Sequence, residues 1–287
     1  MKPPPFAYHD PSTLEEAITL LATLPNARPL AGGQSMMPML NMRFAQPDHL
    51  VDLNRIAGMD GVTVEPDGAL LIGAMARQRV LERHSEVALR CPLMVEALAQ
   101  VGHRQTRNRG TIGGSLCHLD PAAELPLVAA VTEALVIAAG PSGRRELAFA
   151  DFAQGYMTPG IEPEELVVAL RIAAQPAGAG SCFLEFARRH GDFAIASVAV
   201  LLVPDAAGRI ASARIALGGV GAVPLRLPDA EMVLRGATAD AFGAAVAATK
   251  TLEPMEDALV PSWYRRHLAG VLLGRALAIA ASRMGRA

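Results

Sequence analysis

The groups best suited to hold a ligand lie in two glycine-rich segments of the sequence. The first, residues 30–38, reads LAGGQSMMP and follows a predicted strand at residues 28–31. Paired glycines let successive backbone N–H groups point into one concavity, and because they lack a Cβ atom a diphosphate can approach closely. Gln34 and Ser35 add side-chain donors. A Gly-Gly pair also serves as a plain turn, so this segment alone leaves both interpretations open.

The second segment, residues 107–126, reads RNRGTIGGSLCHLDPAAELP and contains more polar side chains. Arg107 and Arg109 are able to offset negative charge, whereas His118, Asp120 and Glu124 are able to hydrogen-bond to sugar or ribityl hydroxyls. Each of these residues is also common in purely structural settings. Two similar segments in one chain nevertheless favour a shared ligand that carries phosphate groups.

Several common site motifs are absent from the sequence. A GxGxxG fingerprint after a strand, which would indicate a Rossmann dinucleotide site, does not occur, nor does the GxxxxGK of a P-loop. The HExxH pattern of zinc proteases and the GxSxG of a nucleophile elbow are missing as well. Any nucleotide would therefore be bound in another way.

Composition narrows the class of protein further. The chain has 287 residues, 51% of them apolar and 19% charged, which is enough for a packed core and room for two domains. A net charge of −2 gives no general attraction to nucleic acid. No apolar stretch approaches the about 20 residues of a membrane span, and no secretory signal is evident, so we expect a soluble, cytoplasmic protein without a membrane span.

The pattern of the chain predicts mixed helices and strands, an α+β protein rather than a doubly wound one. A capping box at residues 12–15 predicts a helix at 13–24. Hairpins are predicted around 66–68 and 140–143, with a linker at 173–180. The other predicted elements are helices at 76–83, 92–101, after Pro121, and at 228–234, 238–249 and 261–283, and strands at 165–172, 182–189, 196–203 and 209–217.

Residues 31–35 and 111–115 resemble the paired FAD-diphosphate loops of molybdenum hydroxylase flavin subunits. These are the medium subunits of the carbon monoxide dehydrogenase and xanthine dehydrogenase family. Further segments resemble family signatures in the same order, namely 5–8 with the helix that follows, 120–126, 188–194 and 264–268. The resemblance covers nearly the whole chain.

The resemblance implies a fold of two domains. Residues 1–175 would form an FAD-binding domain of the vanillyl-alcohol-oxidase (PCMH) type, with subdomains at about 1–55 and 56–175. Residues 176–287 would form a C-terminal α/β domain of the carbon monoxide dehydrogenase flavoprotein type, with a small antiparallel sheet and helices.

The resemblance also implies a set of cofactor-binding positions, but no catalytic residue and no metal ligand. Residues 31–36 and 110–115 would hold the diphosphate, Glu124 would supply a carboxyl group to FAD, and Leu166 would lie beside the isoalloxazine. At position 193 some relatives have Tyr, so its hydroxyl is absent here. The implied positions are Ala31, Gly32, Gly33, Gln34, Ser35, Met36, Thr106, Gly110, Thr111, Gly113, Gly114, Ser115, His118, Asp120, Glu124, Leu166, Asp192 and Phe193.

The implied function is that of the FAD-binding subunit of a heteromeric molybdenum hydroxylase. In this family electrons pass from a molybdenum centre through two [2Fe–2S] clusters to FAD and then to an external acceptor. Each cluster needs four ligands, and this chain has only Cys91, Cys117 and Cys182, without a CxxC pair. The clusters would therefore lie on an iron–sulfur small subunit and the molybdenum cofactor on a molybdopterin large subunit, in a dimer of heterotrimers.

Two alternatives remain open at this stage. A stand-alone FAD-dependent oxidase or dehydrogenase of the same fold would need its own substrate pocket. A non-catalytic module would bind a nucleotide without redox chemistry. In the leading interpretation electron entry requires no general base, so His118 and Asp120 are expected to hold FAD rather than to abstract a proton.

Overall fold

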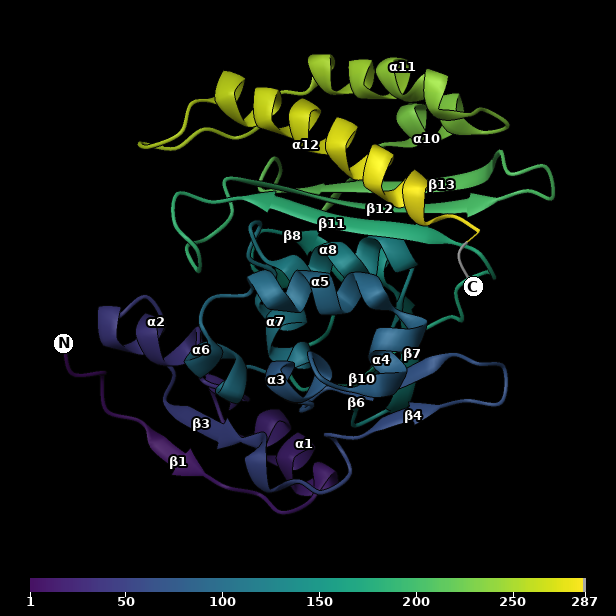
Figure 1. Cartoon of the computed structure of the whole chain (residues 1–287). Coiled ribbons are helices and arrows are strands. Elements are labelled where there is room, and N and C mark those ends of the chain that lie inside the picture. Colours follow the sequence, from purple (N-terminus) through teal and green to yellow (C-terminus); the bar gives the residue numbers. More distant parts are fainter. Residues whose placement is uncertain (286–287) are drawn as a thin grey trace.

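The computed structural model describes residues 1–285, and its N-terminal part begins with a small parallel sheet (Figure 1). This sheet has the strand order β1-β3-β2, and both outer strands run parallel to β3. Helices α1 and α2 follow β1 and β2 in the chain. The bounds are β1 Ala7–His9, α1 Leu14–Thr23, β2 Ala27–Leu30, α2 Met36–Met42 and β3 His49–Asp52.

Helix α1 is capped one residue later than the sequence predicted. The side chain of Thr13, not Ser12, accepts the Glu16 N–H at 3.1 Å, and the Glu16 carboxylate accepts the Ser12 N–H at 2.9 Å. The predicted box at residues 12–15 is therefore wrong by one position. The sequence offers a hydroxyl at both Ser12 and Thr13 and a glutamate three residues after each, and the start at Leu14 buries Ala17 and Leu21.

A five-stranded antiparallel sheet forms the centre of the N-terminal part, with the order β4-β5-β10-β6-β7. Both predicted hairpins, β4–β5 and β6–β7, are confirmed. The predicted strand at 165–172 becomes the central strand β10, because nearly all of its side chains are buried. The bounds are β4 Val62–Val64, β5 Leu70–Gly73, β6 Leu135–Gly140, β7 Gly143–Ala148 and β10 Leu166–Ile172.

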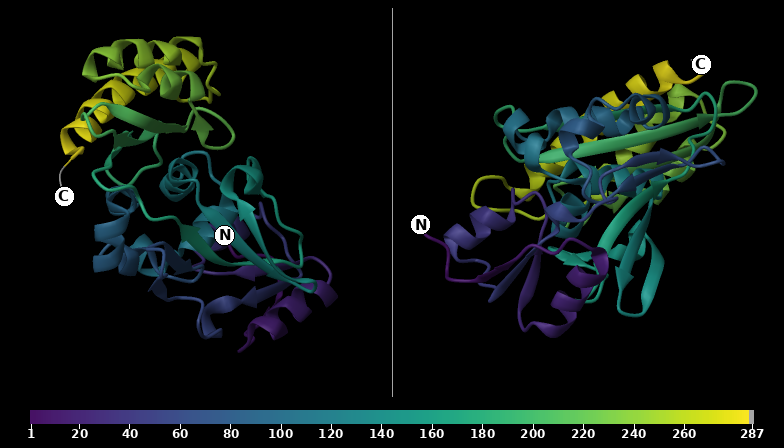
Figure 2. Two further views of the ribbon diagram at one scale, coloured as in Figure 1. Left: turned by 90° about the vertical axis from the view of Figure 1, so that its right-hand side faces the viewer. Right: turned by 90° about the horizontal axis from the view of Figure 1, so that it is seen from below.

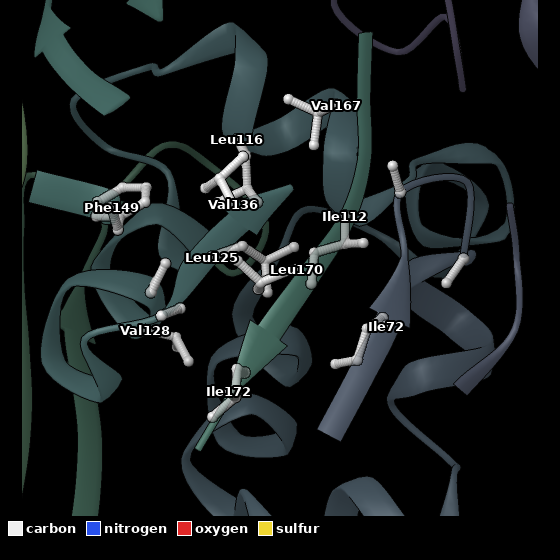
Figure 3. Packing of buried hydrophobic residues seen from close by; sticks show 14 of the residues in the cluster. Ile72, Ile112, Leu116, Leu125, Val128, Val136, Phe149, Val167, Leu170 and Ile172 are labelled. Carbon is white, nitrogen blue, oxygen red and sulfur yellow. The ribbon is translucent and has the colours of Figure 1, made fainter. Parts of the chain in front are cut away.

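Short helices pack on this sheet and complete the first hydrophobic core. Figure 3 shows Leu170 and Ile72 of the sheet meeting Ile112, Leu116 and Leu125 of the helices. The helices are α3 Gln78–Leu81, α4 Ser85–Arg90, α5 Pro92–Gln100, α6 Arg104–Arg109, α7 Ile112–His118, α8 Glu124–Thr132 and α9 Phe149–Phe152, and a two-stranded ribbon joins β8 Ala153–Gly155 to β9 Thr158–Pro159.

The C-terminal part is a four-stranded antiparallel sheet, β11-β12-β13-β14, between two layers of helices (Figures 1 and 2). Helix α12 packs on one face, and α5 and α8 pack on the other. The predicted helix at 238–249 is interrupted, since 3-10 turns flank a short α11. The bounds are β11 Gly180–Phe186, β12 Ala196–Pro204, β13 Ile210–Gly218, β14 Leu225–Arg226, α10 Pro228–Leu234, α11 Phe242–Ala247 and α12 Ser262–Arg283.

Side chains alternate between the two faces of this C-terminal sheet. Phe183, Ala199 and Ala216 belong to the core of the N-terminal part, whereas Cys182 and Val198 belong to the core under α12. Both faces are therefore buried, which explains why β12 reads as a continuous apolar run rather than as an alternation. Among the helices of residues 1–285, none has the length and apolarity needed to cross a bilayer.

Glu96 of α5 links the two parts of the molecule. Its Oε2 accepts the Phe183 N–H at 2.9 Å, and its Oε1 accepts from Arg283 of α12 at 2.5 Å. The same guanidinium donates to the Ser181 carbonyl at 2.5 Å. One carboxylate thus joins an N-terminal helix, the start of β11 and the end of the C-terminal helix.

We expect Glu96→Ala to lower the free energy of unfolding by about 1–3 kcal/mol, because it leaves the Phe183 N–H without its acceptor. Glu86→Ala is the matched control: Glu86 belongs to a partly exposed i,i+4 pair with Arg90 and should change stability by no more than about 0.5 kcal/mol. Urea denaturation followed by circular dichroism measures both. If both substitutions lowered the free energy of unfolding equally, the hydrogen bonds of Glu96 would not stabilise the packing of the C-terminal part on the N-terminal part.

Candidate functional site

One large cavity, of about 910 Å³, lies where the parallel sheet, helices α6–α8 and the C-terminal part meet. Its walls include both glycine-rich segments. Every position that the resemblance implied lies along it: residues 31–36 of the first segment, Thr106, residues 110, 111 and 113–115, then His118, Asp120, Glu124, Leu166, Asp192 and Phe193. Residues widely separated in the sequence therefore surround a single space.

The first glycine-rich segment packs directly against the second. A Cβ atom on Gly32 would overlap with the carbonyl group of Arg109 and lie 2.9 Å from Gly110 Cα. Gly33 has a φ of +73°, a conformation that side chains with a Cβ atom rarely adopt. The sequence suggested that Gly32 lacks a side chain so that a diphosphate can approach. In the structure the missing side chain of Gly32 makes room for the backbone of the second segment instead.

The first segment also offers unused backbone donors. Gly33 and Ser35 accept hydrogen bonds at the start of α2, from Met37 and Met39 at 3.1 Å each. The N–H groups of Gly33, Gln34 and Ser35, in contrast, find no acceptor within residues 1–285. Successive free amides of this kind form an anion-binding concavity.

The second glycine-rich segment is the start of helix α7 rather than a loop. Thr111 is its N-cap and accepts the Gly114 N–H at 3.1 Å. The amides of Ile112 and Gly113 donate to the carbonyls of Ala76 and Ala74 at 3.1 and 2.8 Å, which holds the helix start on the strand–helix connection after β5. A Cβ atom on Gly113 would lie 2.6 Å from that of Ala74, so close packing again requires the glycine.

The two arginines of the second segment do not line the large cavity. Arg107 is buried and forms an ion pair with Glu82 at 3.0 Å, while it donates to the Val101 carbonyl at 2.8 Å. Arg109 lines a smaller cavity of about 530 Å³ that shares the first glycine segment. The idea that both guanidinium groups offset ligand charge in the large cavity is therefore not supported by their positions.

Two titratable side chains of the cavity, His118 and Glu124, are shifted towards their neutral forms. Burial lowers the pKa of His118, and the charge of Asp120 offsets part of this shift. Burial, and then the charge of Glu185, raise the pKa of Glu124 to about 8. Asp120 has a structural task as well, because its Oδ1 accepts the Ala122 N–H at 2.8 Å and turns the chain into α8.

The C-terminal part supplies one edge of the cavity through the loop between β11 and β12. Gly191 has a φ of +87°, and a Cβ atom there would lie 2.5 Å from the His103 ring. The loop between β11 and β12 therefore packs against the N-terminal part at His103. Asp192 follows, and Phe193, with 77% of its side chain exposed, stands at the rim.

Sequence reasoning missed several residues of the cavity. Gln78 is 5% exposed and its Oε1 has no hydrogen-bond partner among the described residues, although it borders the cavity beside Gly110. Residues 157–159 and 161–163, around β9, form another part of the wall. Gln78 stands alone in the sequence and the β9 region contains no glycine-rich motif, so no local pattern indicated either of them.

Comparison with known families identifies both parts of the chain. Residues 4–174 match the FAD binding domain in molybdopterin dehydrogenase, and residues 181–280 match the CO dehydrogenase flavoprotein C-terminal domain. The 6-hydroxypseudooxynicotine dehydrogenase complex subunit alpha of Paenarthrobacter nicotinovorans is 38% identical over 287 residues, covering 99% of this chain and 97% of the relative. The carbon monoxide dehydrogenase medium chain of Hydrogenophaga pseudoflava is 38% identical over 282 residues, covering 96% and 97%.

Solved structures extend the likeness to the whole fold. A structure of carbon monoxide dehydrogenase from Hydrogenophaga pseudoflava contains a chain that superposes with a TM-score of 0.96 at 38% identity, covering 99% of this chain and 100% of that one. Quinoline 2-oxidoreductase from Pseudomonas putida 86 gives a TM-score of 0.93 at 36% identity, with 98% and 99% covered. The chain belongs to the family of FAD-binding medium subunits of molybdenum hydroxylases, of which the carbon monoxide dehydrogenase medium chain is a member.

Proposed function

We propose that FAD lies in the large cavity and that this chain is the flavin subunit of a heteromeric molybdenum hydroxylase. In this role it receives electrons from [2Fe–2S] clusters on a partner chain and passes them on to an external acceptor. The observation that carries the proposal is the convergence of both glycine-rich segments on one cavity, with three unused N–H donors at residues 33–35.

The residues present fit such a cofactor. The free amides of Gly33, Gln34 and Ser35 would hold the diphosphate, and the unpartnered Gln78 Oε1 would accept from a hydroxyl of the cofactor. Ser115, Thr106 and His118 would supply further polar contacts, while Leu166 and Phe193 would cover apolar ring surface. FAD, when bound, supplies the redox chemistry, and the protein's task is to bind it, orient it and limit access of water.

The proposal places the other redox centres on partner chains. The three cysteines cannot ligate two clusters, and within residues 1–285 no group of three His, Cys, Asp or Glu side chains is arranged to hold a metal ion. We propose an iron–sulfur small subunit and a molybdopterin large subunit as partners, in a dimer of heterotrimers in the cytoplasm. The relatives named as a medium chain and as a complex subunit support a multisubunit assembly. Residues 1–175 would be the FAD-binding domain and 176–287 the C-terminal domain.

We expect Gly32→Ala to abolish or strongly reduce FAD loading, because its Cβ atom would push the first segment away from Arg109 and Gly110. Overpacking of this kind also costs about 1–3 kcal/mol of stability. The ratio of flavin to protein absorbance after incubation with FAD measures loading, and thermal unfolding measures stability.

Gly61→Ala is the control for this substitution, since a Cβ atom at Gly61 meets nothing within 4 Å. Its FAD content should equal that of the parent chain. A folded Gly32→Ala chain with full FAD content would show that the contact between the two segments is not required for the cofactor.

The proposed function as a whole is tested with the full chain, alone and co-expressed with its iron–sulfur and molybdopterin partners. We expect close to one FAD per chain in both preparations. A reducing substrate should bleach the flavin absorbance only in the complex, whereas dithionite should bleach it in both. Substrate oxidation by the chain alone would favour the stand-alone oxidase or dehydrogenase, and a colourless chain that binds nucleotide would favour a module without redox chemistry.

A further inference from the structure

The segment 120–126 lies against the C-terminal sheet at the inner end of the cavity. The Gly219 N–H donates to the Pro121 carbonyl at 2.7 Å, and a Cβ atom on Gly218 would lie 3.4 Å from the Leu127 side chain. Helix α8, which begins with Glu124, packs on β12 and β13. Glu124 therefore lines the cavity directly beside the boundary with the C-terminal part.

Glu185 of β11 faces the same boundary from the other side. It stands two residues after Phe183, which belongs to the N-terminal core, so both side chains point to the same face of the sheet. Glu185 is paired across β11 and β12 with Ser197. Glu185 Oε2 and Ser197 Oγ are both buried and have no hydrogen-bond partner within residues 1–285.

Within residues 1–285, neither Glu124 nor Glu185 forms an ion pair with a cation. Besides Glu185, the charged groups that act on Glu124 are Asp120, just before α8, and Arg107 of α6. The Arg107 guanidinium is already bound to Glu82 at 3.0 Å and to the Val101 carbonyl at 2.8 Å. Burial raises the pKa of Glu185 to about 7, and burial together with the Glu185 charge raises the pKa of Glu124 to about 8.

We propose that Glu124 and Glu185 form a carboxyl pair across the boundary between the two parts of the molecule, and that the pair keeps a proton so that Glu124 meets FAD as a neutral hydrogen-bond donor. Glu185 is a positioning residue in this arrangement, because it acts on the cofactor only through Glu124. The inference rests on the proposed function, since it places Glu124 at FAD.

The physical reason is that two neighbouring carboxyl groups, both largely shielded from solvent, cannot both ionise without an electrostatic cost. A protonated acid donates to a carbonyl, a hydroxyl, a ring nitrogen or a phosphate of the cofactor, whereas a carboxylate only accepts. A carboxylate would also repel the diphosphate. Neutral Glu124 therefore favours binding of an anionic cofactor, and its deprotonation opposes that binding.

The first test measures the FAD dissociation constant of the full chain between pH 6 and pH 9.5. For the parent we expect a constant value up to about pH 7.5 and then a weakening that approaches tenfold per pH unit. Glu124→Gln, which keeps a neutral donor, should bind FAD within about threefold of the parent at pH 7 and lose the pH dependence. Glu185→Gln removes the like charge, so the weakening should begin at lower pH.

Glu146→Gln, on exposed strand β7, is the matched control and should follow the parent at every pH. A second readout needs no cofactor: carboxyl ¹³C spectra of the glutamate-labelled chain. We expect two glutamates to titrate above about pH 6.5 in the parent, one of them to disappear in Glu124→Gln, and the Glu124 signal to move to lower pH in Glu185→Gln.

Two results would overturn the inference while leaving the proposed function intact. One is normal FAD binding by a parent chain in which every glutamate titrates below about pH 6. The other is more than about tenfold weaker FAD binding by Glu124→Gln at pH 7, together with parent affinity that rises with pH, because Glu124 would then bind as a carboxylate. A parent chain that binds no FAD at all would instead overturn the proposed function and, with it, the role of Glu124 at the cofactor.

Discussion

The cavity depends on the close approach of two backbone segments that are far apart in the sequence. Gly32 lies against the Arg109 carbonyl, and a Cβ atom at Gly32 would lie 2.9 Å from Gly110 Cα. These contacts fix the parallel sheet of residues 7–52 relative to helices α6 and α7. Since the atoms around Gly32 belong to the backbone, no side-chain rearrangement can relieve a substitution there, and the shape of the cavity depends on glycine at this position.

The C-terminal part closes the same cavity, so the two parts of the molecule depend on each other. Glu96 joins α5 to β11 and α12, the Pro121 carbonyl accepts from Gly219, and the Gly191 loop rests on His103. Segment 120–126 consequently does two things. It forms the turn that leads into α8, and it packs against the C-terminal sheet. Movement of the C-terminal part would therefore change the surroundings of Glu124, even though Glu124 belongs to an N-terminal helix.

Local patterns predicted the elements that local forces determine. Helix α1, the two hairpins and strands β10, β12 and β13 follow from apolar periodicity and turn residues, so the sequence was sufficient for them. Strands β1 and β3 were missed because they have three and four residues, and they are strands only through parallel pairing within the N-terminal sheet. Gln78 and Arg107 show the same limit for the site, since their roles depend on neighbours distant in sequence: one borders the cavity without a partner, and the other is held by Glu82.

The electrostatics of the cavity suit a subunit that positions an anionic cofactor. Arg107 is engaged by Glu82, whereas Arg109 lines the smaller cavity beside the first glycine segment. Burial shifts His118 and Glu124 towards their neutral forms. An anionic cofactor would then be held by oriented backbone amides, which carry no proton that can be lost near neutral pH. Binding by backbone amides depends on backbone geometry, so the contact between the two glycine segments would determine the affinity together with the protonation of Glu124.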